Sequence, residues 1–155
     1  MMDIQLVKDA ALLLPLSRQL QELHQRAFPH IFKPFDEAAV ATYFNDCMAD
    51  DAYRHYAAFE DGMACGYIQA QHIERPESAF VASYGYIHIH QLIVGNGSRQ
   101  KGIATALMNT VLAFAREMGS ARIDLTVWNF NEAAHSFFKK TGFTDDLQRM
   151  YINLP

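Results

Sequence analysis

One segment, Tyr84–Met118, combines a strand-like run, a glycine-rich break and an amphipathic helical pattern. Residues 84–94 are rich in aliphatic and aromatic side chains, and Gly95-Asn96-Gly97-Ser98 interrupts them. Apolar residues then recur at helical spacing, at Ile103, Leu107, Val111, Ala115 and Met118. We therefore expect a strand, a turn and a helix in direct succession, which is typical of α/β folds.

The flanking sequence predicts further strands and helices on both sides of this segment. In chain order we expect a strand at 3–7, a helix from Pro15 that stops before Phe28, a helix capped by Asp36, strands at 56–59 and 63–73 joined by Glu60-Asp61-Gly62, a strand at 123–128, a helix capped by Asn131 and followed by Gly142, and a strand-like run at 149–154. This order predicts a mixed sheet with helices on both faces.

Length and composition favour one domain covering residues 1–155. Half of the 155 residues are apolar, and no linker, repeat or low-complexity tract divides them. The formal net charge of −4, with no basic run, argues against nucleic acid or an anionic membrane as partner. We find no secretory pattern or membrane-length apolar stretch, and we expect a cytoplasmic protein in which Cys47 and Cys65 are buried free thiols.

The turn before the predicted helix at 103–118 has the chemistry of a phosphate site. Arg99-Gln100-Lys101-Gly102-Ile103-Ala104 leads straight into that helix. The first amide groups of a helix lack internal acceptors and lie at the positive end of its dipole, so they suit a phosphate. Gly102 allows close approach of the backbone to a ligand, and Arg99 and Lys101 add positive charge.

This pattern resembles the (Gln/Arg)-x-x-Gly-x-(Gly/Ala) motif of the GNAT superfamily of N-acetyltransferases, which bind acetyl-CoA. The run from Asn131 to Phe143 also resembles the late helix of that superfamily, written Asn-x-x-Ala-x-x-Phe-Tyr-x-x-x-Gly-Phe. The two motifs and the order of elements before them cover essentially the whole chain. The resemblance implies a GNAT-like α/β fold, with a mixed, mostly antiparallel central sheet of six to seven strands and helices on both faces.

The resemblance also implies which residues hold acetyl-CoA. Backbone groups of Leu92, Ile93 and Val94 would pair with the pantetheine arm as an added strand would. The diphosphate would lie against the turn and the helix start, and Asn131 and Phe138 would contact the pantetheine end; the residues of the turn are Arg99, Gln100, Lys101, Gly102, Ile103, Ala104 and Thr105.

Phe138 departs from the family pattern. Many members have a tyrosine at this position, whose hydroxyl can protonate the leaving thiolate. Phe138 keeps the ring and loses the proton donor. Because a thiol with a pKa near ~8.5 leaves tolerably without an acid, we expect slower or differently assisted chemistry, with Tyr151 or a water as a substitute.

Two histidines on the strand before the turn are the candidate proton acceptors. A period of two places His88, His90, Leu92 and Val94 on one face of that strand. The run is similar to the His-x-His-x-Leu-x-Val segment of serotonin N-acetyltransferases, which implies a base or proton relay, with His90 ahead of His88. One alternative is that one or both histidines are simply polar residues on a half-buried face of the strand. Another is a zinc site completed by His72, but we expect no metal.

We therefore expect an acetyl-CoA-dependent enzyme that acetylates a primary amine by direct attack. In the family the loop around Phe28 and Phe32 usually walls the acceptor site, although these side chains could equally be packing residues. The sequence does not identify the acceptor, which is the amine of a small molecule or of a protein. It also does not decide whether the protein forms a homodimer. A non-catalytic acetyl-CoA sensor is the main alternative, and a metal enzyme built on the histidines is a weaker one.

Overall fold

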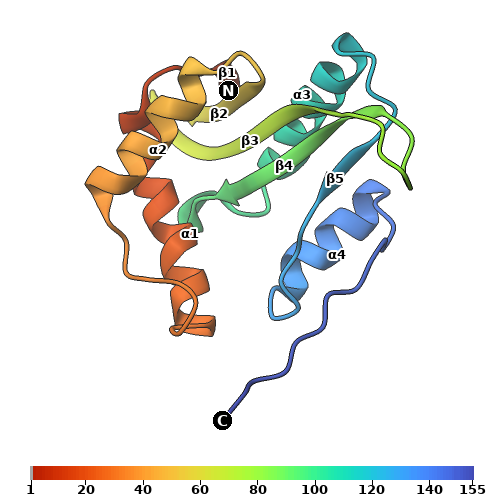
Figure 1. Cartoon of the computed structure of the whole chain (residues 1–155). Coiled ribbons are helices and arrows are strands. Elements are labelled where there is room, and N and C mark those ends of the chain that lie inside the picture. The colour runs from red at the N-terminus through yellow and green to blue at the C-terminus, as the bar shows by residue number, and fades with distance from the viewer. Residues whose placement is uncertain (1) are drawn as a thin grey trace.

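The structure is a computed structural model that describes residues 2–155. Five strands form one sheet in the order β1-β2-β3-β4-β5, with antiparallel pairs except for the parallel pair β4–β5 (Figure 1). The strands are β1 (Asp3–Leu6), β2 (Tyr53–Glu60), β3 (Met63–Arg75), β4 (Tyr84–Val94) and β5 (Ile123–Leu125), and the helices are α1 (Leu14–Ala27), α2 (Glu37–Ala49), α3 (Ile103–Glu117) and α4 (Glu132–Thr141). The predicted mixed, mostly antiparallel sheet is confirmed.

Local sequence signals explain where several elements begin and end. The hairpin between β2 and β3 turns at Asp61 and Gly62, which both have positive φ, as a tight two-residue turn requires. The carboxylate of Asp36 accepts a hydrogen bond from the Ala39 amide and caps α2, as predicted. Asn131 caps α4 in the same way, and Gly142 ends that helix in the left-handed region.

Helices cover both faces of the sheet, and each face has its own apolar core. On one face, Phe44 of α2 and Leu16 of α1 pack with Tyr67 and Ile93 of the sheet. On the other face, α3 and α4 pack against a second cluster that includes Ile68, Ile87, Leu107, Phe114 and Phe138. The two cysteines are buried free thiols, as predicted.

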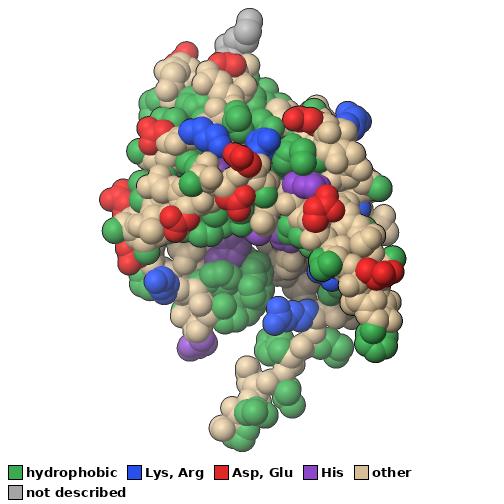
Figure 2. Space-filling view, turned by 45° about the horizontal axis from the view of Figure 1, so that its top comes forward, with side chains coloured by type: hydrophobic (Ala, Val, Ile, Leu, Met, Phe, Trp, Pro, Cys, Tyr) green, Lys and Arg blue, Asp and Glu red, His purple; other side chains and the backbone are tan. Residues whose placement is uncertain are grey.

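The sheet has five strands among the described residues, so the expectation of six to seven is wrong. β5 is three residues long, where a strand over 123–128 was expected, and the strand-like run at 149–154 forms no strand. Residues 144–155, called the tail below, extend away from the body as a chain without regular secondary structure (Figure 2). Alternating apolar residues specify a strand only where a partner strand accepts their backbone groups.

A β-bulge changes the faces to which the residues of β4 point. Gln69 of β3 pairs with Gln91 and Ala70 pairs with Ile89, so His90 is an extra residue without a partner. Beyond it the alternation is inverted: Leu92 and Val94 pack on the α3 face with Ile89, whereas Ile93 packs on the α1–α2 face. The prediction that His88, His90, Leu92 and Val94 share one face is therefore wrong for Leu92 and Val94.

Candidate functional site

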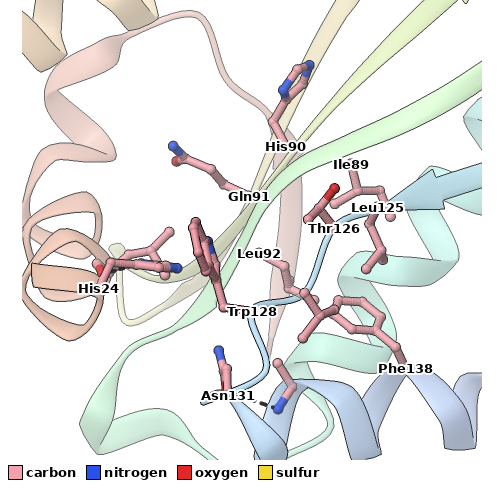
Figure 3. A pocket seen from close by; sticks show the side chains of 13 residues that line it. His24, Ile89, His90, Gln91, Leu92, Leu125, Thr126, Trp128, Asn131 and Phe138 are labelled. Carbon is pink, nitrogen blue, oxygen red and sulfur yellow. Dashed lines mark hydrogen bonds between the residues drawn. The ribbon is translucent and has the colours of Figure 1, made fainter. Parts of the chain in front are cut away.

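The parallel strands β4 and β5 separate part-way along their length. Their pairing runs from Ile87–Ile123 to Ile89–Leu125 and then stops. Residues 90–94 of β4 therefore have no strand partner on that side within the described chain, residues 2–155. A hollow lies at the fork (Figure 3). Its walls come from α1, from β4, from β5 and the segment that follows it, and from α4 with its capping residue; they include Ile89, His90, Gln91, Leu92, Leu125, Thr126, Trp128, Asn131 and Phe138. The open backbone edge of Leu92, Ile93 and Val94 can therefore accept an extended ligand as an added strand.

The N-terminus of α3 lies just beyond the end of β4. Among the residues that the structure describes, no side chain caps this helix, so the first amides of Ile103, Ala104 and Thr105 have no internal acceptor. Gln100 and Gly102 both have left-handed backbone conformations, with φ of 63° and 76°. Successive amide groups in such a turn form a concave anion site, and the helix dipole adds to it.

The charged side chains of this turn lie at the surface. Arg99 is exposed, and the ammonium of Lys101 is 3.3 Å from the carboxylate of Glu60. Both can move toward a bound phosphate because neither is held in a packed core. The buried Ile103 instead anchors the turn to the sheet.

Asn131 and Phe138 reach the hollow from α4 (Figure 3). The side-chain oxygen of Asn131 is used by the Ala134 amide, and its NH2 group has no hydrogen-bond partner among residues 2–155. Phe138 is almost fully buried and makes edge-to-face contacts with Phe137 and Phe143. Asn131 can thus offer a donor to a ligand, whereas Phe138 offers only an apolar surface.

His90 lines the fork, and its surroundings keep the imidazole neutral. The carbonyl oxygen of the Gln71 side chain lies 2.8 Å from Nε2, so Nε2 carries the proton and Nδ1 keeps the lone pair. One side of the ring is exposed to the hollow, but the protein around the rest of it lowers the pKa of His90 to about 4, with a smaller lowering from charge on His88. At neutral pH this histidine can therefore accept a proton.

His88 lies behind His90 and is held by Asp124 of β5. The two imidazole rings are 4.7 Å apart between centroids and nearly perpendicular. Nδ1 of His88 donates to the carboxylate of Asp124 over 2.6 Å, which leaves Nε2 of His88 as the acceptor atom. The parallel pairing of β4 with β5 places these residues directly opposite each other. The result is a carboxylate–histidine pair beside the ring that lines the fork.

A second hollow of ≈ 200 Å³ opens beside His90 and Gln91 toward α1. Phe32 and Trp128 line it, and His24 lies on the α1 side. These rings belong to an aromatic cluster that joins the loop after α1 to the loop after β5, with centroid separations of 4.9–6.5 Å; its members are His24, Phe28, Phe32, Trp128 and Phe130. Phe28 supports this wall without lining the hollow.

Trp128, which the sequence analysis did not place at the site, is partly exposed and forms part of the pocket wall. Asp124 was also missed by the sequence analysis. The helix α3 separates β4 from β5 in the sequence, so no local sequence pattern indicates which residues of the two strands lie opposite each other. The pairing of Asp124 with His88 therefore could not be predicted. An aromatic residue shortly after a predicted strand is a weak signal that could have suggested a pocket wall for Trp128.

The zinc alternative does not fit the geometry. His72 pairs across the strands with Ile87, whereas His88 pairs with Gln71, so the His72 and His88 side chains lie on opposite faces of the sheet. Within residues 2–155 no three histidine, cysteine or acidic side chains are arranged to hold a metal ion. Over the same residues, no helix is both long and apolar enough to cross a bilayer.

Comparisons with known proteins agree with this geometry. An uncharacterized N-acetyltransferase of Methanocaldococcus jannaschii is 28% identical over 108 residues; the match covers 66% of this chain but only 44% of that relative. A tetramutant of the BH1408 protein of Bacillus halodurans superposes with a TM-score of 0.91 at 19% identity, covering 99% of both chains. A predicted acetyltransferase of Clostridium acetobutylicum, solved with acetyl-CoA, gives a TM-score of 0.75 at 22% identity, covering 99% of this chain and 96% of that one.

The two solved structures show a shared fold. A family model described as "Acetyltransferase (GNAT) family" matches residues 17–143, from early α1 to the residue after Gly142. That span includes the fork between β4 and β5, the turn before α3 and the late helix α4. The chain therefore belongs to the GNAT acetyltransferase family.

Proposed function

We propose that this protein transfers the acetyl group of acetyl-CoA to a primary amine. The observation that carries the proposal is one continuous surface: an unpaired stretch of β4 leads to the uncapped start of α3, and a neutral histidine lies at the fork. Acetyl-CoA would supply the acetyl group as a thioester. The residues described above fit such a molecule, because they offer backbone pairing, an anion site and an apolar wall in that order.

The roles of the binding residues follow from their positions. The backbone of Leu92, Ile93 and Val94 pairs with the amides of the pantetheine arm, and the NH2 group of Asn131 donates to it from the other side. The diphosphate lies against the turn and the first amides of α3, with Arg99 and Lys101 as mobile counter-charges; the amides come from Gln100, Lys101, Gly102, Ile103, Ala104 and Thr105.

The proton-transfer role falls to His90 and His88 together. An attacking amine must lose its proton, and an unperturbed alkylamine is almost wholly ammonium at neutral pH. We assign the first acceptor to His90, because it lines the hollow and is neutral. A pKa of about 4 makes His90 a weak base, so we propose that the proton passes on to the adjacent His88, whose positive charge Asp124 balances.

The departing thiolate has no side-chain acid in this site. Phe138 has no hydroxyl, and Tyr151 lies on the exposed tail and lines neither hollow. We propose that the thiolate leaves unprotonated or takes a proton from water, because a thiol pKa near ~8.5 makes it a tolerable leaving group.

The acceptor hollow favours an amine attached to an apolar or aromatic group. Its lining combines Phe32, Trp128 and Leu20 with neutral polar groups, and none of its lining residues is acidic. A polyamine would find no carboxylate there for its additional charges. An aromatic wall stabilises a ring or alkyl chain by packing, so this geometry favours an amine with one positive charge over a polycationic one.

Release of the CoA thiol in the presence of an amine panel tests the proposal. We expect phenylethylamine to be acetylated with a kcat/KM at least tenfold above that of spermidine. Replacing both His88 and His90 by Gln should reduce kcat about 10²- to 10⁴-fold while leaving acetyl-CoA affinity unchanged. Binding of acetyl-CoA without thiol release for any amine would support the sensor alternative instead.

A further inference from the structure

Gln91 of β4 lines the hollow that opens beside His90 toward α1. It pairs across the strands with Gln69, whose side chain is hydrogen-bonded to Tyr43 of α2, so Gln91 also points to the face that α1 and α2 cover. Figure 3 shows its side chain extending from β4 toward the side on which His24 lies. Neither the acetyl-CoA surface nor the proton-transfer pair uses this side chain.

A tyrosine hydroxyl holds the oxygen of the Gln91 amide. Tyr67 of β3 donates its hydroxyl hydrogen to Oε1 of Gln91 over 2.6 Å. The tyrosine is fully buried and packs edge-to-face with Phe44 of α2. Burial raises the pKa of Tyr67, so the hydroxyl keeps its hydrogen and remains a donor. Oε1 of Gln91 is therefore turned toward the core and is held there.

The NH2 group of Gln91 is left free to meet a ligand. Within residues 2–155 it makes no hydrogen bond. Over the same residues, the buried side-chain nitrogen and oxygen atoms without a partner belong to His55 and Ser120, so the nitrogen of Gln91 is not sealed in the core. Gln91 is half-buried, and the space beside it is the second hollow. The wall of that hollow thus offers N–H donors at this point.

Donors at this point suit an oxygen atom and not a cation. An ammonium group presents N–H hydrogens, which cannot bond to the N–H hydrogens of Gln91, whereas a hydroxyl, ether or carbonyl oxygen presents a lone pair. The α1 side of the hollow differs. Nδ1 of His24 donates to a backbone carbonyl over 2.8 Å, and so does Nε2 of Gln21, which leaves an acceptor atom on each of these side chains. Donor and acceptor groups therefore lie on different walls.

We propose that the acceptor amine carries an oxygen atom and that the NH2 group of Gln91 binds this oxygen. The inference rests on the proposed function, since it takes the second hollow as the acceptor site. Gln91 then determines specificity, because an amine without the oxygen displaces water and leaves the N–H donors unpaired. Tyr67 is a positioning residue: without its hydroxyl, the amide is free to turn and present its own oxygen to the hollow.

Calorimetric titration of amines into the CoA-bound protein tests the inference without requiring turnover. Phenylethylamine, which has no oxygen, is compared with three relatives that carry one at different positions: phenylalaninamide, phenylalaninol and tyramine. At least one of the three should bind wild type about tenfold more tightly than phenylethylamine does. Gln91→Leu should reduce this advantage to less than about twofold, and Tyr67→Phe should reduce it about threefold, with the affinity for CoA unchanged in both variants.

Gln91→Glu gives a second readout of opposite sign. The Tyr67 hydroxyl still donates to one carboxylate oxygen, so the other faces the hollow with a negative charge. Spermidine should then bind about tenfold more tightly than it binds wild type, and the oxygen-bearing amine should lose its advantage. Gln148→Glu is the control, because it adds the same charge on the tail, away from both hollows, and should change neither affinity.

Two results would overturn the inference. One is that none of the oxygen-bearing amines binds wild type more tightly than phenylethylamine. The other is an advantage that survives Gln91→Leu in a protein that circular dichroism shows to be folded. Acetyl transfer is measured separately: oxygen-bearing amines that bind through Gln91 but are never acetylated would refute the proposed function alone, and acetylation without any preference for the oxygen would refute this inference alone.

Discussion

Replacing Asp124 by Asn tests whether the carboxylate assists proton transfer through His88. The Asn side chain has nearly the same shape, so β5 should remain in register, but the negative charge is lost. In the wild-type protein Asp124 accepts a hydrogen bond from His88 at 2.6 Å, which fixes the tautomer and balances the charge that the ring acquires. The variant should therefore bind acetyl-CoA normally and turn over more slowly.

The size of the effect follows from the exposure of the pair. Two unit charges about 4 Å apart interact by roughly 4 kcal/mol at an effective dielectric constant near 20. The side chains of His88 and Asp124 are 26% and 36% exposed, so solvent screens part of this energy. A remaining ~1–2 kcal/mol corresponds to a roughly 5- to 30-fold loss of kcat at about 1.4 kcal/mol per tenfold.

Thiol release with a saturating amine measures this loss directly. Glu74→Gln is the matched control, since it removes a carboxylate that contacts another histidine of the sheet, His72, away from both hollows. We expect the control to retain wild-type kcat. A kcat for Asp124→Asn within twofold of wild type, with the fold intact, would refute the role given to the pair.

Two further predictions test the anion site and a buried histidine. Gly102→Glu should weaken CoA binding more than 100-fold in a calorimetric titration. Gly62→Glu is the control, because Gly62 also has positive φ and open space around its Cβ but lies away from the site, so this variant should bind CoA as wild type does. Equal CoA affinities of the two variants would contradict the account. Burial lowers the pKa of His55 to about 4, below the ~6.5 of the unfolded chain, so the unfolded state takes up its proton first as pH falls. The free energy of unfolding in urea should therefore drop between pH 7 and 4.5 by about 2 kcal/mol more in wild type than in His55→Phe; identical pH dependence would show that His55 does not contribute.

Much of the fold was predictable because its signals are local. Asp61-Gly62 predicts its own hairpin, and Asp36 and Asn131 occupy the capping positions that their side chains suit. The glycine turn before α3 also lies where the sequence places it. Each of these features depends on residues within about four positions of one another, so no knowledge of the tertiary structure is needed.

The errors arose where distant segments decide the outcome. A strict period of two over residues 88–94 misses the inserted residue at His90, which inverts the faces of Leu92 and Val94. The tail has the alternation of a strand, but no strand of residues 2–155 pairs with it. Asp124 meets His88 only through the register of two parallel strands, which the sequence does not encode locally.

The central claim is that acetyl-CoA lies along the open edge of β4 with its diphosphate at the start of α3. A crystal structure of the protein with CoA measures this most directly. We expect diphosphate oxygens at hydrogen-bond distance, ~3 Å, from the amides of Ile103, Ala104 or Thr105, with the pantetheine arm paired to Leu92–Val94. CoA bound at another surface, with the fork between β4 and β5 empty, would contradict the account.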